Sequence, residues 1–182
     1  PFSVALEGDG FFQIRTESGE LQYTRDGSFE ISPVANGNML CTSDGNPVLD
    51  AYGNQIILPS NRVATDLVVN QDGTLAFPDG TGNPAVITDA NGRPVKFGIY
   101  QFNNPAGLSK EGSNNYSVTV ASGAAVAENG NAAVKQTKTH QYYTEASNVD
   151  VANEMVNLIV AQRAYEMNSK AIQASDEMMQ QA

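Results

Sequence analysis

The side chains that most often carry catalysis are scarce in this sequence. His140 is the only histidine and Cys41 the only cysteine, too few for a clustered metal site or a nucleophilic triad. Twenty acidic residues could supply the carboxylate pair of a glycosidase, but several, such as Asp44 and Asp72, directly precede a glycine, where a carboxylate usually hydrogen-bonds its own turn. No phosphate-binding loop and no zinc or calcium motif is present. We therefore expect no enzyme, no cofactor or metal site and no small-molecule substrate.

The charge balance narrows the possible partners. Twenty acidic and ten basic residues give a net charge of -10 at pH 7 and a pI near 4.4, whereas nucleic acids are bound by clustered lysines and arginines. No apolar run approaches the roughly 20 residues that cross a bilayer. We expect neither nucleic-acid binding nor membrane insertion. Cys41 follows the apolar pair Met39-Leu40, which predicts a buried thiol rather than a reactive one.

Glycine and proline divide the chain into two parts. All sixteen glycines lie at or before Gly130, and all eight prolines lie at or before Pro105. Eight Asp-Gly or Asn-Gly pairs in the first part favour tight turns. Short β-prone runs lie between them, at residues 11–15, 21–24, 56–58, 67–69, 96–102 and 116–120. This spacing predicts an antiparallel β-sandwich or barrel-like domain over residues 1–130.

The second part predicts a short return followed by a helix. Residues 131–147 are expected to hold a linker with a further strand near residues 134–139. Ser147 and Asp150 then have the spacing of a helix cap, and residues 148–182 contain no helix breaker. A helix of about 32 residues is ~48 Å long, longer than the roughly 36 Å diameter of the β-domain. The expected fold class is mainly β with a long C-terminal α-helix of coiled-coil type.

Apolar residues along the expected helix form a seam with a second stripe beside it. Because the helix is longer than its own domain, we expect part of this surface to contact another chain or a segment encoded before Pro1. A helix folded back on its own sheet and a helix lying on a membrane surface are the alternatives; the length opposes the first, and the scarcity of lysine and arginine opposes the second. The expected subunit-interaction residues are Val151, Met155, Val156, Leu158, Ile159, Arg163, Tyr165 and Ile172.

Three stretches resemble the flagellar hook and basal-body rod protein family. The runs Gly8-Asp9-Gly10-Phe11-Phe12 and Tyr23-Thr24-Arg25-Asp26-Gly27-Ser28-Phe29 are similar to the opening of that family's β-domain. Residues 147–170 are similar to its C-terminal helix, and Arg163-Ala164-Tyr165-Glu166 is most similar to the distal-rod members. Residues 102–108 and 122–123 add weaker similarity.

The first two stretches are expected to build a fold motif. Within it, Asp26-Gly27 is expected to make a tight hairpin, with Arg25 and Asp26 as anchors. The motif residues are Gly8, Gly10, Phe11, Phe12, Tyr23, Arg25, Asp26, Gly27 and Phe29.

The resemblance implies a structural subunit of the helical tube of the basal body, outside the inner membrane. Such a subunit is exported through the flagellar type III secretion channel and assembles with copies of itself and with other rod or hook subunits. The resemblance also implies an N-terminal helical segment that packs beside the C-terminal helix. Since this sequence starts at Pro1 without such a segment, we expect it to be a C-terminal fragment.

A function of another class is a cell-surface β-domain that binds a glycan or protein ligand and carries the helix as a stalk. That function predicts aromatic side chains clustered on an exposed sheet face. The seven phenylalanines and seven tyrosines are instead scattered along the sequence, and tryptophan is absent. The pattern therefore favours the structural subunit.

Overall fold

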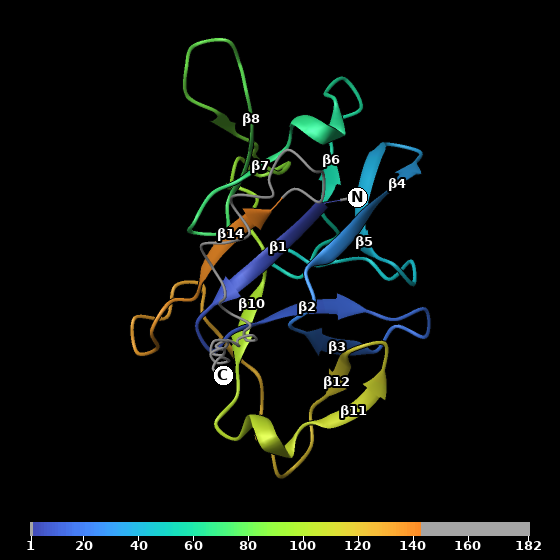
Figure 1. Cartoon of the computed structure of the whole chain (residues 1–182), viewed down its shortest axis with the longest axis vertical. Coiled ribbons are helices and arrows are strands. Elements are labelled where there is room, and N and C mark those ends of the chain that lie inside the picture. Colours follow the sequence, from blue (N-terminus) through green and yellow to red (C-terminus); the bar gives the residue numbers. More distant parts are fainter. Residues whose placement is uncertain (1, 143–182) are drawn as a thin grey trace, which may run out of the picture. The chain divides into compact units, whose positions relative to one another are not determined.

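The computed structural model describes residues 2–142, which form a chain of short strands (Figure 1). Contacts divide the whole chain into one unit of residues 1–141 and another of residues 142–182. The strands are β1 (Phe2–Glu7), β2 (Phe11–Arg15), β3 (Leu21–Thr24), β4 (Ser28–Val34), β5 (Gly37–Thr42), β6 (Ile57–Leu58), β7 (Val68–Val69), β8 (Leu75–Phe77), β9 (Ala85–Val86), β10 (Ile99–Gln101), β11 (Ser109–Gly112), β12 (Asn115–Ser117), β13 (Val126–Ala127) and β14 (Lys138–Tyr142).

Three sheets share these strands. A five-stranded sheet has the order β14-β1-β4-β5-β6, a six-stranded sheet has the order β11-β12-β3-β2-β10-β13, and β7-β8-β9 form a third. The strand pairs whose register is defined are antiparallel. In Figure 1 the strands β2, β3, β11 and β12 lie below β1, β4 and β5. The chain changes from one sheet to the next at the β1–β2 and β3–β4 connections.

The main core lies where the three sheets meet. Phe12 of β2 makes edge-to-face contacts with Phe29 of β4 at a ring-centroid distance of 5.0 Å and with Phe97 at 5.1 Å. Buried leucines and valines from β5, β6, β7 and β8 complete the same cluster. Complete burial of one such side chain contributes about 1.5–3 kcal/mol. This shared core therefore stabilises all three sheets together.

The turn signals located some strands and missed others. The runs predicted at residues 11–15 and 21–24 coincide with β2 and β3, whereas the strand expected near residues 134–139 is β14, at Lys138–Tyr142. The hairpin of β4 and β5 was not predicted. In its first strand, exposed and buried residues alternate only as far as Ile31. The strand also contains Pro33, and a proline within a run normally argues against a strand.

The expected fold class is wrong in its helical part. The helices found within residues 2–142 are two three-residue 3-10 turns, η1 (Ala64–Asp66) and η2 (Pro105–Gly107), so the supported fold is built from antiparallel sheets. Residues 148–182, on which the long helix was expected, lie outside the described residues. A helical sequence pattern records local propensity, whereas most helix stability in proteins comes from packing against neighbours. The division at residues 130 and 147 stays a prediction. Within residues 2–142, no helix is long and apolar enough to span a membrane.

The Asp26-Gly27 pair does not form the expected tight hairpin. β3 and β4, on either side of it, belong to different sheets. Gly27 is required for space: a Cβ there would lie 1.8 Å from the carbonyl oxygen of Val4. The Val4 amide donates to the Gly27 carbonyl at 3.0 Å. The pair therefore carries the chain between sheets and lets β1 lie beside β4.

We expect Gly27→Ala to lower the free energy of unfolding by about 3 kcal/mol, because the added methyl group must push β1 away from β4. Gly45→Ala is the matched control. Gly45 has a φ of +86° with no atom within 4 Å of an added Cβ, so only the cost of a left-handed alanine, about 1–2 kcal/mol, is expected. Urea denaturation of the purified chain measures both. Equal losses would show that close backbone approach is not what Gly27 provides.

Candidate functional site

The residues of the fold motif converge on the loop between β1 and β2. Arg25 reaches this loop from the β3–β4 connection. Its Nη1 donates to the carbonyl oxygens of Gly8 at 2.7 Å and Gly10 at 2.5 Å, and its Nη2 donates to that of Leu6 at 3.2 Å. A planar guanidinium with five N–H donors can serve several carbonyls at once. One side chain thereby fixes the path of the chain between two sheets.

The electrostatic surroundings of Arg25 keep it in place. Burial lowers the pKa of Arg25, and the carboxylates of Asp9 and Glu128 oppose this shift. The guanidinium carbon also lies 5.8 Å from the centroid of the Phe11 ring. An arginine guanidinium stays charged at neutral pH whatever its exposure. All these contacts are structural.

A buried carboxylate lies behind the same loop. Glu128 is 3% exposed, and Thr137 donates to it twice, from its amide at 2.8 Å and from its hydroxyl at 2.6 Å. Gln101 Nε2 donates to the same carboxylate at 2.7 Å, while the Thr137 hydroxyl accepts from the amide of Gly10 at 3.0 Å. A buried charge is tolerated when its oxygens are hydrogen-bonded in this way. The network joins β2, β10 and the segment before β14.

Gly10, like Gly27, is needed for close approach. A Cβ at Gly10 would lie 2.3 Å from Cγ2 of Ile99 and 2.6 Å from the hydroxyl oxygen of Thr137. The other six glycines of the Asp-Gly and Asn-Gly pairs have a positive φ, as their turn signals predict. Gly10 and Gly27 therefore differ from these six, because close approach and not a positive φ excludes a side chain there.

The two adjacent phenylalanines of the motif serve different clusters. Phe12 belongs to the main core, whereas Phe11 packs with Tyr23, Phe102 and Leu108 in a second cluster. Tyr23 and Phe102 meet edge to face at 5.0 Å. Burial raises the pKa of the Tyr23 hydroxyl, and the hydrogen bond that it accepts from a glutamine amide partly offsets the rise.

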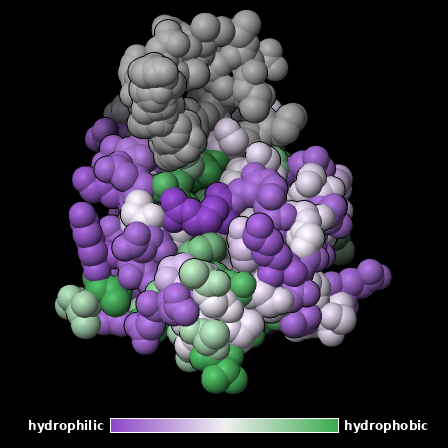
Figure 2. All heavy atoms as spheres, turned by 60° about the horizontal axis from the view of Figure 1, so that its bottom comes forward, coloured by the Kyte–Doolittle hydropathy of each residue, from purple (hydrophilic) through white to green (hydrophobic). Residues whose placement is uncertain are grey.

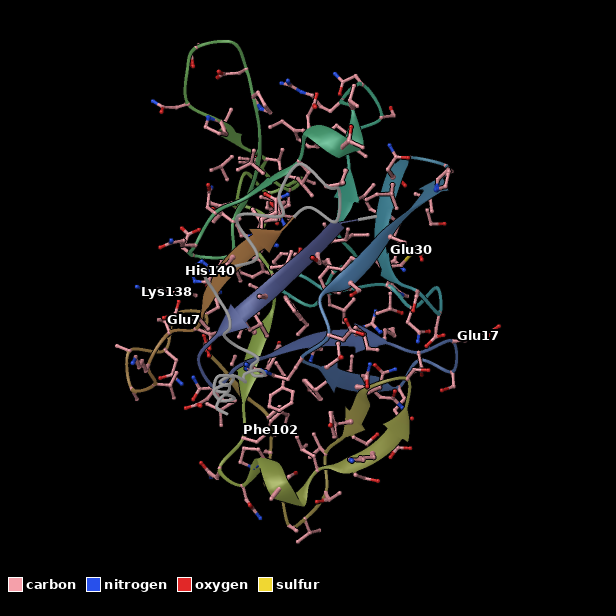
Figure 3. All side chains as sticks on the ribbon, in the orientation of Figure 1. Glu7, Glu17, Glu30, Phe102, Lys138 and His140 are labelled. Atoms are coloured by element: carbon pink, nitrogen blue, oxygen red, sulfur yellow. The ribbon has the colours of Figure 1, made fainter. Side chains whose placement is uncertain are left out.

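The second cluster corrects the view of the aromatic residues as scattered. Strands β2, β3, β10 and β12 and the loop after β10 bring five rings together: Phe11, Tyr23, Tyr100, Phe102 and Tyr116. The rings are buried or half-buried, and Phe102 lies below β10 in Figure 3. The cluster is a second core.

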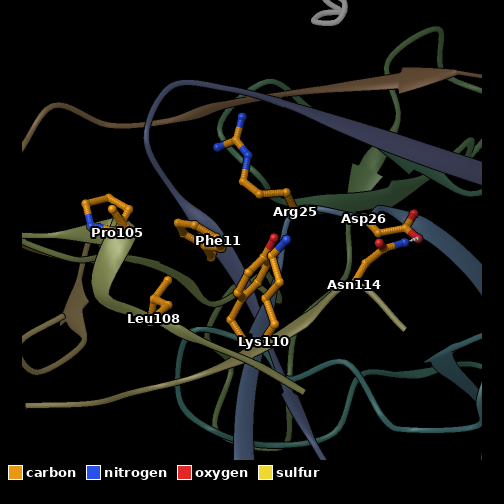
Figure 4. A pocket seen from close by; sticks show the side chains of 9 residues that line it. Phe11, Arg25, Asp26, Pro105, Leu108, Lys110 and Asn114 are labelled. Atoms are coloured by element: carbon orange, nitrogen blue, oxygen red, sulfur yellow. Dashed lines mark hydrogen bonds between the residues drawn. The ribbon is translucent and has the colours of Figure 1, made fainter. Parts of the chain in front are cut away.

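A groove of about 640 Å³ opens beside this second core (Figure 4). Near one end, Asn114 Nδ2 donates to Asp26 Oδ2 at 3.2 Å. The groove combines apolar surface with the charged side chains of Arg25, Asp26 and Lys110. Its lining residues are Phe11, Arg25, Asp26, Pro105, Ala106, Leu108, Lys110, Asn114 and Tyr116.

The remaining reactive groups are also structural. Cys41 is 3% exposed, which confirms the predicted burial, and burial, reinforced by the nearby Glu30 carboxylate, raises the pKa of its thiol. A thiol in this state is a poor nucleophile. Residues 2–142 contain no group of three or more His, Cys, Asp or Glu side chains placed to hold a metal ion.

The last described strand is fixed by two residues that sequence reasoning did not identify. Gln141 Nε2 donates to the carbonyl of Leu67 at 2.8 Å, and its Oε1 accepts from the amide of Val69 at 3.0 Å, so a side-chain amide completes the edge of β7. His140 Nε2 lies 2.6 Å from Oε1 of Glu7 and joins β14 to β1 (Figure 3). A polar side chain carries no sequence signal for a partner about 70 or more positions away. Among the buried polar residues, Glu128 does have a sequence signal: it is a single charged residue that follows the apolar run 124–127.

The residues expected to contact other subunits lie outside the described residues. They are Val151, Met155, Val156, Leu158, Ile159, Arg163, Tyr165 and Ile172.

Two family models match separate parts of the chain. Residues 5–77 match the D1 domain of flagellar hook protein FlgE/F/G, and residues 140–182 match the C-terminal region of flagellar basal-body rod FlgEFG proteins.

Individual relatives extend over nearly the whole chain. It is 40% identical over 180 residues to flagellar basal-body rod protein FlgG of Borreliella burgdorferi. That alignment covers 97% of this chain and 61% of the relative. It is 37% identical over 183 residues to FlgG of Bacillus subtilis, covering 98% and 62%. It is also 37% identical over 166 residues to the hook-basal body complex protein FlhP of that organism, covering 89% and 56%. The chain thus spans about three fifths of the length of these relatives.

We expect Glu128→Gln to lower the free energy of unfolding by about 1.5–3 kcal/mol, because an amide NH2 would then face one of the donors that the carboxylate now satisfies. Glu111→Gln removes the same charge at an exposed position of β11 and should change stability by less than about 0.5 kcal/mol. Thermal denaturation of the two variants separates the effects. A loss for Glu128→Gln no larger than the control would contradict a stabilising network.

Proposed function

Because the chain belongs to the flagellar hook and basal-body rod protein family, we propose that it is a structural subunit of the flagellar basal-body rod. The observation that carries the proposal is the extent of the similarity: 97% of the chain aligns with a rod protein at 40% identity. The relatives from three organisms that bear the name basal-body rod protein favour the rod over the hook. The similarity of residues 163–166 to distal-rod members supports the distal part of the rod.

In this role the protein acts in the basal body and has no catalytic activity. Its partners are copies of itself, other rod or hook subunits and, as a finer proposal, the N-terminal segment that the resemblance implies. The buried polar network supports a structural role, since its hydrogen bonds join segments that lie far apart in the chain. Fold rigidity is what a load-bearing tube needs from such a domain.

The first and last described strands support a role in which a C-terminal stretch makes assembly contacts. β1 and β14 are neighbours in one sheet. His140 pairs with Glu7 of β1, and Gln141 hydrogen-bonds the backbone of Leu67 and Val69. The last described strand is therefore held by side chains as well as by its place in the sheet.

We propose that the apolar residues of the C-terminal stretch make the contacts between subunits. These residues fall within residues 140–182, which match the C-terminal family model. Seven of the expected contact residues are apolar, and apolar surface favours association when it is removed from water. The proposed contact residues are Val151, Met155, Val156, Leu158, Ile159, Tyr165 and Ile172, with Arg163 as a polar contact.

The double variant Leu158→Asp with Ile159→Asp tests this function in the bacterium that encodes the protein. We expect recovery of the chain in purified basal bodies to fall at least about tenfold and swimming to stop, because two buried charges cannot be accommodated in an apolar contact. The unfolding midpoint of the β-domain should not change.

Asn153→Asp with Asn157→Asp adds the same two charges without removing apolar side chains and serves as the control. It should assemble within about twofold of the original protein. Normal incorporation of the Leu158 and Ile159 double variant would contradict the proposed subunit contacts, and absence of the original chain from basal bodies would contradict the proposed function.

A further inference from the structure

One surface of the β-domain is built from two segments without charged side chains, beside the groove that Arg25, Asp26 and Lys110 line. We call this surface, formed by residues 103–107 and 118–124, the neutral tip; it contains no Asp, Glu, Lys, Arg or His. It lies at the bottom of Figure 1, below β11 and β12. The whole chain has a net charge of -10. A neutral surface is therefore a distinct feature of an otherwise acidic protein.

The neutral tip exposes apolar groups. Val120 is 103% exposed and Val118 is 42% exposed, and Pro105, Ala106 and Ala121 are exposed beside them. Figure 2, which brings this end of the domain forward, shows apolar residues gathered between hydrophilic ones. Single exposed valines are common on protein surfaces. What distinguishes Val120 is the way in which the turn beneath it is held.

The turn that carries Val120 is locked by reciprocal hydrogen bonds. The Thr119 amide donates to the Ser122 hydroxyl at 2.9 Å, and the Ser122 amide donates to the Thr119 hydroxyl at 3.0 Å. The Ser122 hydroxyl is also within hydrogen-bonding distance of the Thr119 carbonyl, at 2.9 Å. Ser122 has no exposed surface. Val120 is thus presented to solvent on a closed and internally bonded turn.

The neighbouring η2 turn is locked to it. The Thr119 hydroxyl donates to the Gly107 carbonyl at 2.5 Å, and Asn104 Nδ2 donates to the Ala121 carbonyl at 3.0 Å. A Cβ at Gly107 would lie 2.6 Å from the carbonyl carbon of Ala121, so the two backbones are in direct contact. A surface already fixed in one conformation loses little entropy when it binds.

We propose that the neutral tip is a contact surface for a second copy of this chain. The proposal rests on the proposed function, in which copies of the chain stack in a tube. Two copies that each carry a net charge of -10 repel one another, and this repulsion is least where the contacting surface itself has no charge. Interface centres are poor in charged residues for the same reason. A basic partner would instead be drawn to the acidic surfaces elsewhere on the domain.

The contact is expected to be head-to-tail. Open helical assemblies are built from heterologous contacts, in which a surface of one copy meets a different surface of the next. A rigid projection at one end of the domain is suited to this arrangement. The neutral tip would then meet a surface of the neighbouring copy that does not include its own tip.

Val120→Glu tests the proposal, with Val63→Glu as its control. Val63 is 62% exposed and precedes the η1 turn, so the control adds the same charge at an exposed valine outside the tip. We expect recovery of Val120→Glu in purified basal bodies to fall at least about tenfold, recovery of Val63→Glu to stay within about twofold, and both unfolding midpoints to stay unchanged. Val120→Thr, which adds no charge, should assemble within about threefold.

The outcomes separate this inference from the proposed function. Normal recovery of Val120→Glu, or an equal loss for Val63→Glu, overturns the neutral tip as a contact while the subunit function stands. Absence of the original chain from basal bodies overturns both.

The identity of the partner is tested by a Val120→Cys variant coupled in assembled basal bodies to a maleimide–diazirine crosslinker. Cys41, at 3% exposure, is shielded from the reagent. A crosslinked product that contains only this chain supports the proposal, and a product with a different protein overturns it.

Discussion

The architecture depends on close backbone approach at two glycines. At Gly27 the carbonyl of Val4 occupies the space that any side chain would need, and at Gly10 the side chains of Ile99 and Thr137 do so. These are the points at which the chain changes sheets, so β1 and β2 can enter different sheets only if the connections are compact. Arg25 then bonds the carbonyls that this path exposes. Three sheets consequently share one core instead of folding as separate layers.

Buried polar groups extend this constraint to the end of the described domain. Glu128 is satisfied by donors from β10 and from the segment before β14, and Gln141 completes the edge of β7. Each of these contacts would be costly to leave unpaired. These side-chain hydrogen bonds therefore fix β14 to the rest of the described domain.

The distribution of apolar groups indicates where function lies. Nine phenylalanine and tyrosine rings lie in or against two cores, and the groove beside the second core is lined by apolar side chains together with Arg25, Asp26 and Lys110. The exposed apolar residues of the neutral tip are instead held on a hydrogen-bonded turn. Binding surfaces in this protein are thus shaped by backbone geometry more than by reactive side chains, as expected of a building block.

The family followed from the resemblance of three stretches to known proteins. Local chemistry in the sequence was sufficient to predict the β character of residues 1–130, the strands β2 and β3, six glycines with positive φ and the burial of Cys41. These features depend on short-range sterics and alternation, which a sequence displays directly. Tertiary structure alone decided that Asp26-Gly27 joins two sheets, that β4 and β5 pair despite Pro33, and that Glu128 and Gln141 bind partners far along the chain. Those outcomes depend on which segments become neighbours in space, and local propensity carries no record of that. The helical pattern of residues 148–182 shows the same limit, since a pattern does not specify the surface against which it packs.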